Sequence, residues 1–183
     1  MNHRLRFAVP LFAVLVSIPL IGACTPSGPI ATTTVASVDL GRYTGTWYEI
    51  ASVKQFFSIG LVNTTATYTA LADGTIQVKN RGRYFTAEGP ESAIIGSAAP
   101  VDTTGARLNV TFLGTASSMG PGNYWIVDLD KDYQWATVSD PSGLSFFLLS
   151  RTRTISGELK AEIVARAAER GVNVAGSTDT PQL

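Results

Sequence analysis

The feature that most constrains the fold of this chain is a series of about eight short runs, rich in β-branched and aromatic residues, between Tyr43 and Arg151. Segments containing Gly, Asn, Asp and Pro separate these runs at intervals of roughly 8–15 residues, a spacing typical of an antiparallel sandwich or barrel. No alternation of strands with helices is visible. The runs are Trp47–Val53, Asn63–Leu71, Thr75–Arg83, Tyr84–Glu88 continued by Ser92–Ser97, Arg107–Leu113, Asn123–Leu129, Gln134–Ser139 and Ser145–Ser150.

The connections between these runs carry turn signals. Ala72–Gly74 favours a hairpin, because Gly accepts a positive φ at little cost, and Asp140–Gly143 favours another turn. Pro100–Gly105 and Gly114–Gly122 are typical of longer connections. An eight-stranded barrel is the size at which the interior is either filled by side chains or holds one small ligand.

The hydrophobic spacing changes after the last run. Apolar residues recur there on one helix face, at Leu159, Ile163, Val164 and Ala167. Ser156 suits the N-cap of this helix and Gly171 suits its end. The sequence therefore predicts a helix of about 14 residues, a short edge strand at 172–174 and a disordered tail over 176–183. The predicted folded domain spans residues 39–175.

The N-terminus has the features of a secretory signal over residues 1–23. A basic start with Arg4 and Arg6 precedes the apolar run Phe7–Ile21, which is too short to span a bilayer comfortably. The segment ending in Cys24 (Ile-Gly-Ala-Cys) resembles the bacterial lipobox, in which the cysteine is acylated after cleavage. The alternative is a plain signal peptide followed by a chance cysteine.

The lipobox interpretation predicts an exported protein whose lipid anchor is attached to Cys24. Thr25 follows that cysteine, where an aspartate favours retention in the inner membrane, so the outer membrane is expected in a bacterium with two membranes. In other bacteria the anchor would lie on the outer face of the cytoplasmic membrane. Residues 24–38, rich in Thr, Ser, Pro and Gly, are predicted to form a flexible linker.

Two absences narrow the possible chemistry of the domain. The only histidine is His3 and the only cysteine is Cys24, so the predicted domain has neither imidazole nor thiol for an acyl-transfer site or a common zinc site. Asp128, Asp130 and Asp132 have calcium-like spacing, but the loop glycine and distal Glu of a calcium loop are missing, which favours a strand-end role. No metal, cofactor or catalytic residue is expected. The charge balance of about −2 after the signal argues against a nucleic-acid partner.

Three segments, in order, resemble the lipocalins, and most closely the bacterial lipoprotein lipocalins related to apolipoprotein D. They are Gly45–Ala51 around Gly45-Thr46-Trp47, Asn123–Asp130 with Tyr133, and Leu149–Thr152 followed by Ile155 and Ser156. The resemblance runs from about Val38 to Gly171. It implies an all-β, eight-stranded, antiparallel up-and-down barrel with one C-terminal helix packed outside, and a cup for fatty acids, lysophospholipids or similar lipids. Arg153 and the small residues of Gly114–Gly122 depart from the family pattern.

A barrel that is open at one end needs a plug at the other. Trp47, near the start of the first strand and just after Gly45, is large enough to be that plug. Arg151 ends the last strand, and first and last strands are neighbours in a closed barrel. We therefore predict that the Arg151 guanidinium covers the Trp47 indole as a structural cation–π pair at the barrel base.

Alternation along the strands gives the expected lining of the cup. The candidate ligand-binding residues are Tyr68, Tyr84, Ile94, Phe112, Tyr124, Ile126 and Phe147. A register slip of one residue would turn all of them outward. Lys79, Arg81 and Arg83 share one face of a strand, which would bind an anionic head group if it faced inward and otherwise forms a solvated outer surface.

The function predicted from these features is that of a lipid-anchored envelope protein that binds and stores or transports a small hydrophobic ligand without catalysis. One alternative is an envelope interaction module whose barrel is filled by side chains. Another is an enzyme of the same fold that acts on a lipid.

Overall fold

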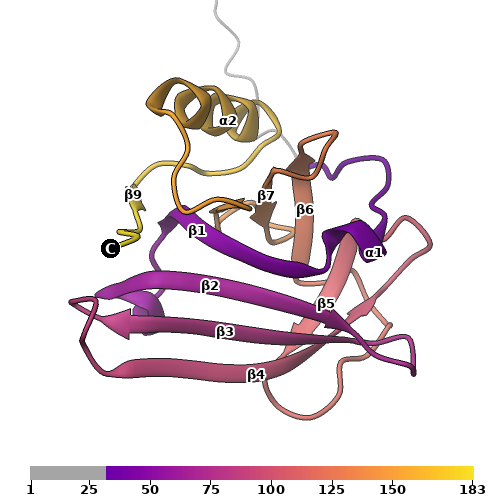
Figure 1. The fold of residues 1–183 in the computed structure, drawn as a ribbon. Helices are drawn as coiled ribbons and strands as arrows, with labels where there is room; N and C mark the ends of the chain where they lie inside the picture. The colour runs from indigo at the N-terminus through magenta and orange to yellow at the C-terminus, as the bar shows by residue number, and fades with distance from the viewer. Residues whose placement is uncertain (1–31) are drawn as a thin grey trace, which may run out of the picture.

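The predicted strands form a closed antiparallel barrel in the computed structural model, which describes residues 32–183 apart from the side chain of Phe57 (Figure 1). Each strand pairs with the next, and β1 pairs with both β2 and β8, which closes the wall. The barrel strands are β1 (Gly45–Val53), β2 (Leu61–Ala70), β3 (Ile76–Tyr84), β4 (Glu91–Pro100), β5 (Arg107–Thr111), β6 (Tyr124–Leu129), β7 (Trp135–Ser139) and β8 (Phe147–Ser150).

The up-and-down order places alternate connections at opposite ends of the barrel. The open end carries the connections 54–60, 85–90, 112–123 and 140–146, of which the first contains the 3₁₀ helix η1 (Phe56–Ser58). The closed end carries 71–75, 101–106 and 130–134, together with the short helix α1 (Leu40–Tyr43). Residues 85–88, predicted as part of the run Tyr84–Glu88, instead belong to the turn 85–90 between β3 and β4.

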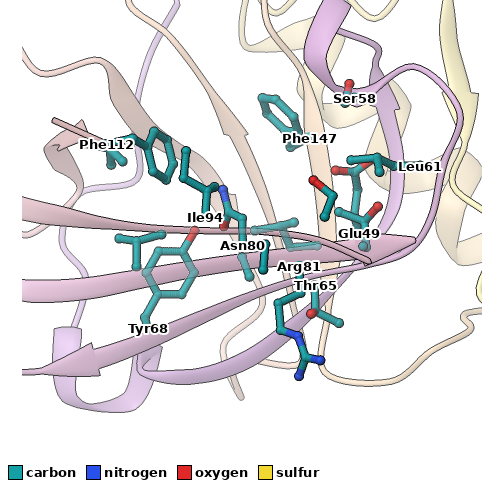
Figure 2. Close-up of a pocket in the computed structure, with 18 of the residues that line it drawn as sticks. Glu49, Ser58, Leu61, Thr65, Tyr68, Asn80, Arg81, Ile94, Phe112 and Phe147 are labelled. Carbon is teal, nitrogen blue, oxygen red and sulfur yellow. The ribbon is translucent and has the colours of Figure 1, made fainter. Parts of the chain in front are cut away.

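Strand β3 shows how alternation builds the wall. Ile76 and Val78 are buried in the barrel core, whereas Arg81 lies on the outer face, where its guanidinium pairs with Glu91 at 2.9 Å. The Arg81 side chain points away from the barrel interior (Figure 2). The basic residues of this strand therefore form the solvated outer surface, not an inward-facing anion site.

Helix α2 (Gly157–Glu169) packs outside the barrel as predicted, above β1, β6 and β7 in Figure 1. The Ser156 side chain caps it by accepting a hydrogen bond from the Leu159 amide at 3.1 Å. Ile163 and Ala167 are fully buried against Val127 and Leu148 on the outer face of the sheet. No helix within residues 32–183 has the length and hydrophobicity needed to cross a membrane.

Asp128 holds this helix in place, which corrects its expected strand-end role. Its buried carboxylate accepts two hydrogen bonds from Arg166, at 2.8 and 3.0 Å, and lies 3.5 Å from Arg170. This hydrogen-bonded ion pair raises the pKa of Arg166. Asp130 instead orders the β6–β7 turn by accepting from the amides of Asp132 and Gln134.

Both ends of the described chain are more ordered than their composition suggests. Residues 32–38, expected to be part of a flexible linker, run along the barrel, and the Val35 amide donates to the Ile126 carbonyl at 3.0 Å. The expected disordered tail forms β9 (Ser177–Asp179), which pairs with β1 next to the place where β1 and β2 diverge. Residues 172–174, the expected edge strand, are irregular. Unsatisfied backbone groups along β1 explain why such a polar segment docks.

Candidate functional site

A cavity of about 710 Å³ occupies the barrel toward its open end (Figure 2). This volume lies within the range of pockets that hold small molecules. Most of its wall is apolar. It is formed by residues of seven barrel strands, all except β7, and of two of the open-end connections. The interaction-module alternative required a barrel filled by side chains, and the barrel is not filled. The predicted cup residues that border it are Tyr68, Tyr84, Ile94, Phe112, Tyr124 and Phe147.

Ile126 is the exception among the seven residues predicted to line the cup. Its side chain is fully buried in the barrel core and does not border the cavity. Alternation correctly puts Ile126 on the same inward face as Tyr124, but it says nothing about depth. Tyr124 lies two residues closer to the open end on the same strand, so its ring lies between the cavity and the Ile126 side chain.

Three tyrosines from different elements meet at the bottom of the barrel interior, and two of them, Tyr68 and Tyr124, border the cavity. Tyr124 Oη accepts a hydrogen bond from Tyr68 Oη at 2.8 Å and lies 2.8 Å from Tyr43 Oη. Burial raises the pKa of Tyr68 to about 12, and it raises those of Tyr43 and Tyr124 well above their usual value. All three phenols are therefore neutral at physiological pH and present an uncharged floor.

Trp47 plugs the barrel below these tyrosines. It is fully buried, its indole nitrogen donates to the Tyr43 carbonyl at 2.8 Å, and its ring lies 5.0 Å from that of Tyr43. The Arg151 guanidinium carbon lies 3.7 Å from the centre of the indole, so the predicted contact is present. Gly45 has φ 96°, and a Cβ there would approach Arg151 Nη1 to 3.2 Å, which explains why glycine precedes this pair.

Arg151 also connects segments that meet at the closed end. Its guanidinium donates to backbone carbonyls of Arg42, Thr44 and Thr46 at 2.8–3.0 Å. A further bond of 3.3 Å from Nε reaches the Tyr133 carbonyl in the β6–β7 connection. A planar fork of five donors can satisfy several carbonyls at once, which a lysine cannot.

Glu49 gives the cavity one polar patch that sequence reasoning missed. Its side chain borders the cavity and is 8% exposed, and Oε1 accepts from Ser52, Lys54 and Thr180. The Lys54 ammonium, 2.7 Å away, neutralises this carboxylate. Glu49 stands two residues beyond Trp47 on the same strand, so the alternation that turned Trp47 inward could have identified it. Thr180, from the C-terminal segment, could not have been found in this way.

Two further polar atoms beside the cavity are buried without a partner among the described residues. They are Thr64 Oγ1 and Asn80 Oδ1, on the neighbouring strands β2 and β3. Within residues 32–183, no group of three or more His, Cys, Asp or Glu side chains is placed to hold a metal ion. The arrangement as a whole can enclose an apolar molecule and offer it a few hydrogen-bonding groups on one side.

Comparison with known proteins agrees with this architecture. Residues 38–182 match the family model described as a lipocalin-like domain. The chain is 39% identical over 171 residues to the outer membrane lipoprotein Blc of Escherichia coli, covering 91% of this chain and 92% of that protein. It is 36% identical over 167 residues to Blc of Citrobacter freundii, with the same coverage.

A solved structure shows the same fold at lower identity. The cockroach allergen Per a 4 superposes with a TM-score of 0.61 at 18% identity, covering 84% of this chain and 94% of that one. With relatives named outer membrane lipoproteins over nearly its whole length, the chain is a lipid-anchored protein of the cell envelope. Cys24, the predicted attachment site, lies outside the described residues and stays a prediction. The matched domain, the closed barrel and the plugged base together establish that this chain belongs to the lipocalin-like family.

Proposed function

We propose that this protein binds one small hydrophobic ligand, such as a fatty acid or a lysophospholipid, in the barrel cavity and stores or transports it without chemical change. The observation that carries the proposal is the mostly apolar cavity of about 710 Å³, plugged at one end and open at the other. Each methylene removed from water contributes about 0.8 kcal/mol, so an alkyl chain supplies the driving force. Membership of the lipocalin-like family supports the same function.

The polar groups of the cavity suggest how a ligand is oriented. Tyr68 and Phe147 line the apolar part, whereas Glu49, Thr64 and Asn80 offer hydrogen-bonding atoms on one side. We expect the alkyl chain to lie against the apolar wall, with the polar group within reach of these side chains or of water at the open end. A buried polar group is tolerated only when it is hydrogen-bonded, so this orientation is the one that costs least.

Binding can be measured on a protein comprising residues 25–183, produced without the anchor. A fluorescent fatty acid is titrated to saturation and then displaced by unlabelled fatty acids and lysophospholipids, while native mass spectrometry gives the stoichiometry. We expect one saturable site. A protein that binds none of these lipids would refute the proposal and favour an interaction module, and turnover of an added lipid or ester would favour an enzyme.

A matched pair of variants locates the site in the barrel. Ala66 borders the cavity and Thr67, next to it on β2, pairs with Thr46 on the outer face. Ala66→Phe places a ring in the cavity and should weaken lipid binding at least about tenfold, the effect of losing roughly 1.4 kcal/mol. Thr67→Phe places the same ring outside and should leave binding unchanged. Equal affinities for the two variants would show that the lipid binds elsewhere.

A further inference from the structure

The open end of the barrel carries large apolar side chains that the protein does not bury. We call five of them the rim: Ile59, Phe85, Leu113, Met119 and Leu144, which are 64%, 74%, 89%, 79% and 65% exposed. Together they represent all four connections at the open end. Single exposed apolar residues are ordinary on a protein surface, but a group of them around the entrance of one cavity is typical of an interaction site.

The rim is also poor in charge. Connection 112–123 contains no charged residue, and the other three contain only Lys54, Glu88 and Asp140. Lys54 is paired with Glu49, and Asp140 accepts hydrogen bonds from the amides of Ser142 and Ser145. Removing this surface from water therefore leaves few charges to desolvate, which favours an apolar partner over a charged one.

The backbone of Phe85 is strained, although most of its ring is exposed to water. Its φ is 69°, the left-handed region that bulky residues avoid, and such a conformation costs about 1 kcal/mol or more. The Phe85 amide donates to the Gly60 carbonyl at 2.8 Å, and the ring covers Gly60, where a Cβ would come within 2.6 Å of it. The backbone therefore holds this ring between two open-end connections while most of its surface remains in water.

The described chain begins beside this end of the barrel. Thr32 donates to the Gly171 carbonyl at 3.3 Å, and a Cβ on Gly143, in connection 140–146, would lie 2.4 Å from the Thr32 hydroxyl. Cys24, the predicted lipid attachment site, is eight residues before Thr32. Eight residues span at most about 28 Å, so the anchor keeps this side of the molecule near the bilayer.

We propose that the rim contacts the surface of the bilayer to which the chain is anchored, so that the cavity opens directly onto lipid. A hydrophobic ligand can then pass between the membrane and the barrel without crossing water. The contact itself depends only on the rim and the anchor, whereas the passage of a ligand rests on the function proposed above.

The contact can be tested on the mature, lipidated full chain in phosphatidylcholine vesicles. Cys24 is the only cysteine, so once it is acylated an introduced cysteine is the single free thiol. A fluorophore is attached at F85C or at L113C, and, as matched control, at L71C, an exposed apolar position in the β2–β3 hairpin at the closed end. Nitroxide on the lipid acyl chains then reports contact with the bilayer.

We expect nitroxide lipids to quench the two rim labels several-fold more than the label at position 71, as for side chains buried in the interface. Equal quenching at all three positions would overturn the proposal. So would rim labels that lipid does not quench but that self-quench or crosslink between molecules, because a second copy of the chain would then cover the rim.

The ligand step needs a variant that changes the rim and not the cavity. Phe85 and Leu113 do not border the cavity, so the double variant F85S/L113S should bind a fluorescent fatty acid in solution with unchanged affinity. Its rate of extracting that fatty acid from vesicles should fall about tenfold, the kinetic counterpart of losing roughly 1.4 kcal/mol. An unchanged rate would refute the ligand step. A wild-type protein that binds no fatty acid would refute the proposed function and leave the quenching result as it stands.

Discussion

The two ends of the barrel differ in what their residues are used for. At the closed end Arg151 donates to five backbone carbonyls, and Trp47 packs below three hydrogen-bonded tyrosines. At the open end the connections are poor in charge and carry exposed apolar side chains. The difference teaches that a cup-shaped protein concentrates its stability at the floor and leaves the entrance free for contact.

The largest effect that this comparison predicts is at Trp47. Trp47→Ala removes a fully buried indole and its hydrogen bond to the Tyr43 carbonyl, and should lower the free energy of unfolding by about 3–5 kcal/mol, measured by urea denaturation. Trp125→Ala, at a tryptophan that is only partly buried on β6, should cost much less. Similar losses at the two tryptophans would contradict the idea that the floor is the stable part.

The next largest effect is expected at Arg151. Arg151→Ala leaves the carbonyls of Arg42, Thr44 and Thr46 without their donor and removes the cation–π contact, so a loss of about 2–3 kcal/mol is expected. Arg151→Lys should recover little of it, because an ammonium cannot reach several carbonyls at once. If Arg151→Lys had the melting temperature of the wild type, a positive charge would be sufficient at this position and the several donors of the guanidinium would not be needed.

How far the sequence predicted this division can be seen in particular residues. The series of strands and the C-terminal helix follow from hydrophobic patterns that repeat along the chain. The Trp47 plug and its contact with Arg151 follow from the closure of the barrel. Alternation identified the inward face, yet it could not give depth, which is why Ile126 was misplaced in the cup wall. Pairings between distant segments, such as Asp128 with Arg166 or Glu49 with Thr180, have no local signal at all.

The buried tyrosines at the floor of the barrel should make the protein less stable at high pH. Burial raises the pKa of Tyr68 from 10.0 to about 12, so this group favours the folded state fully below pH 10. That contribution is lost as the pH rises from 10 to 12, and one pKa unit corresponds to about 1.4 kcal/mol, so unfolding should become easier by about 2 kcal/mol. Denaturation of Tyr68→Phe should show a shallower decline over this interval, and an identical slope would remove Tyr68 from the explanation.

The smallest predicted effect compares two aromatic residues in the same strained conformation at opposite ends. Tyr133, at the closed end, has φ 61°, but its hydroxyl accepts from the Asp39 amide at 2.9 Å and Arg42 lies 4.0 Å above its ring. Phe85, at the open end, has φ 69° and a ring that is mostly exposed. Glycine relieves the backbone strain at either position. Only at Tyr133 does the substitution also remove contacts whose free energy is comparable to that of the strain.

Phe85→Gly should therefore raise the free energy of unfolding by about 0.5–1 kcal/mol, whereas Tyr133→Gly should lower it by about 1 kcal/mol. Thermal melts of the two variants in solution, away from lipid, measure the difference. If Phe85→Gly also lowered the free energy of unfolding, the Phe85 ring would contribute to the stability of the fold. A more stable protein that extracts lipid from vesicles more slowly would show that the strain at the open end is retained for contact with the membrane.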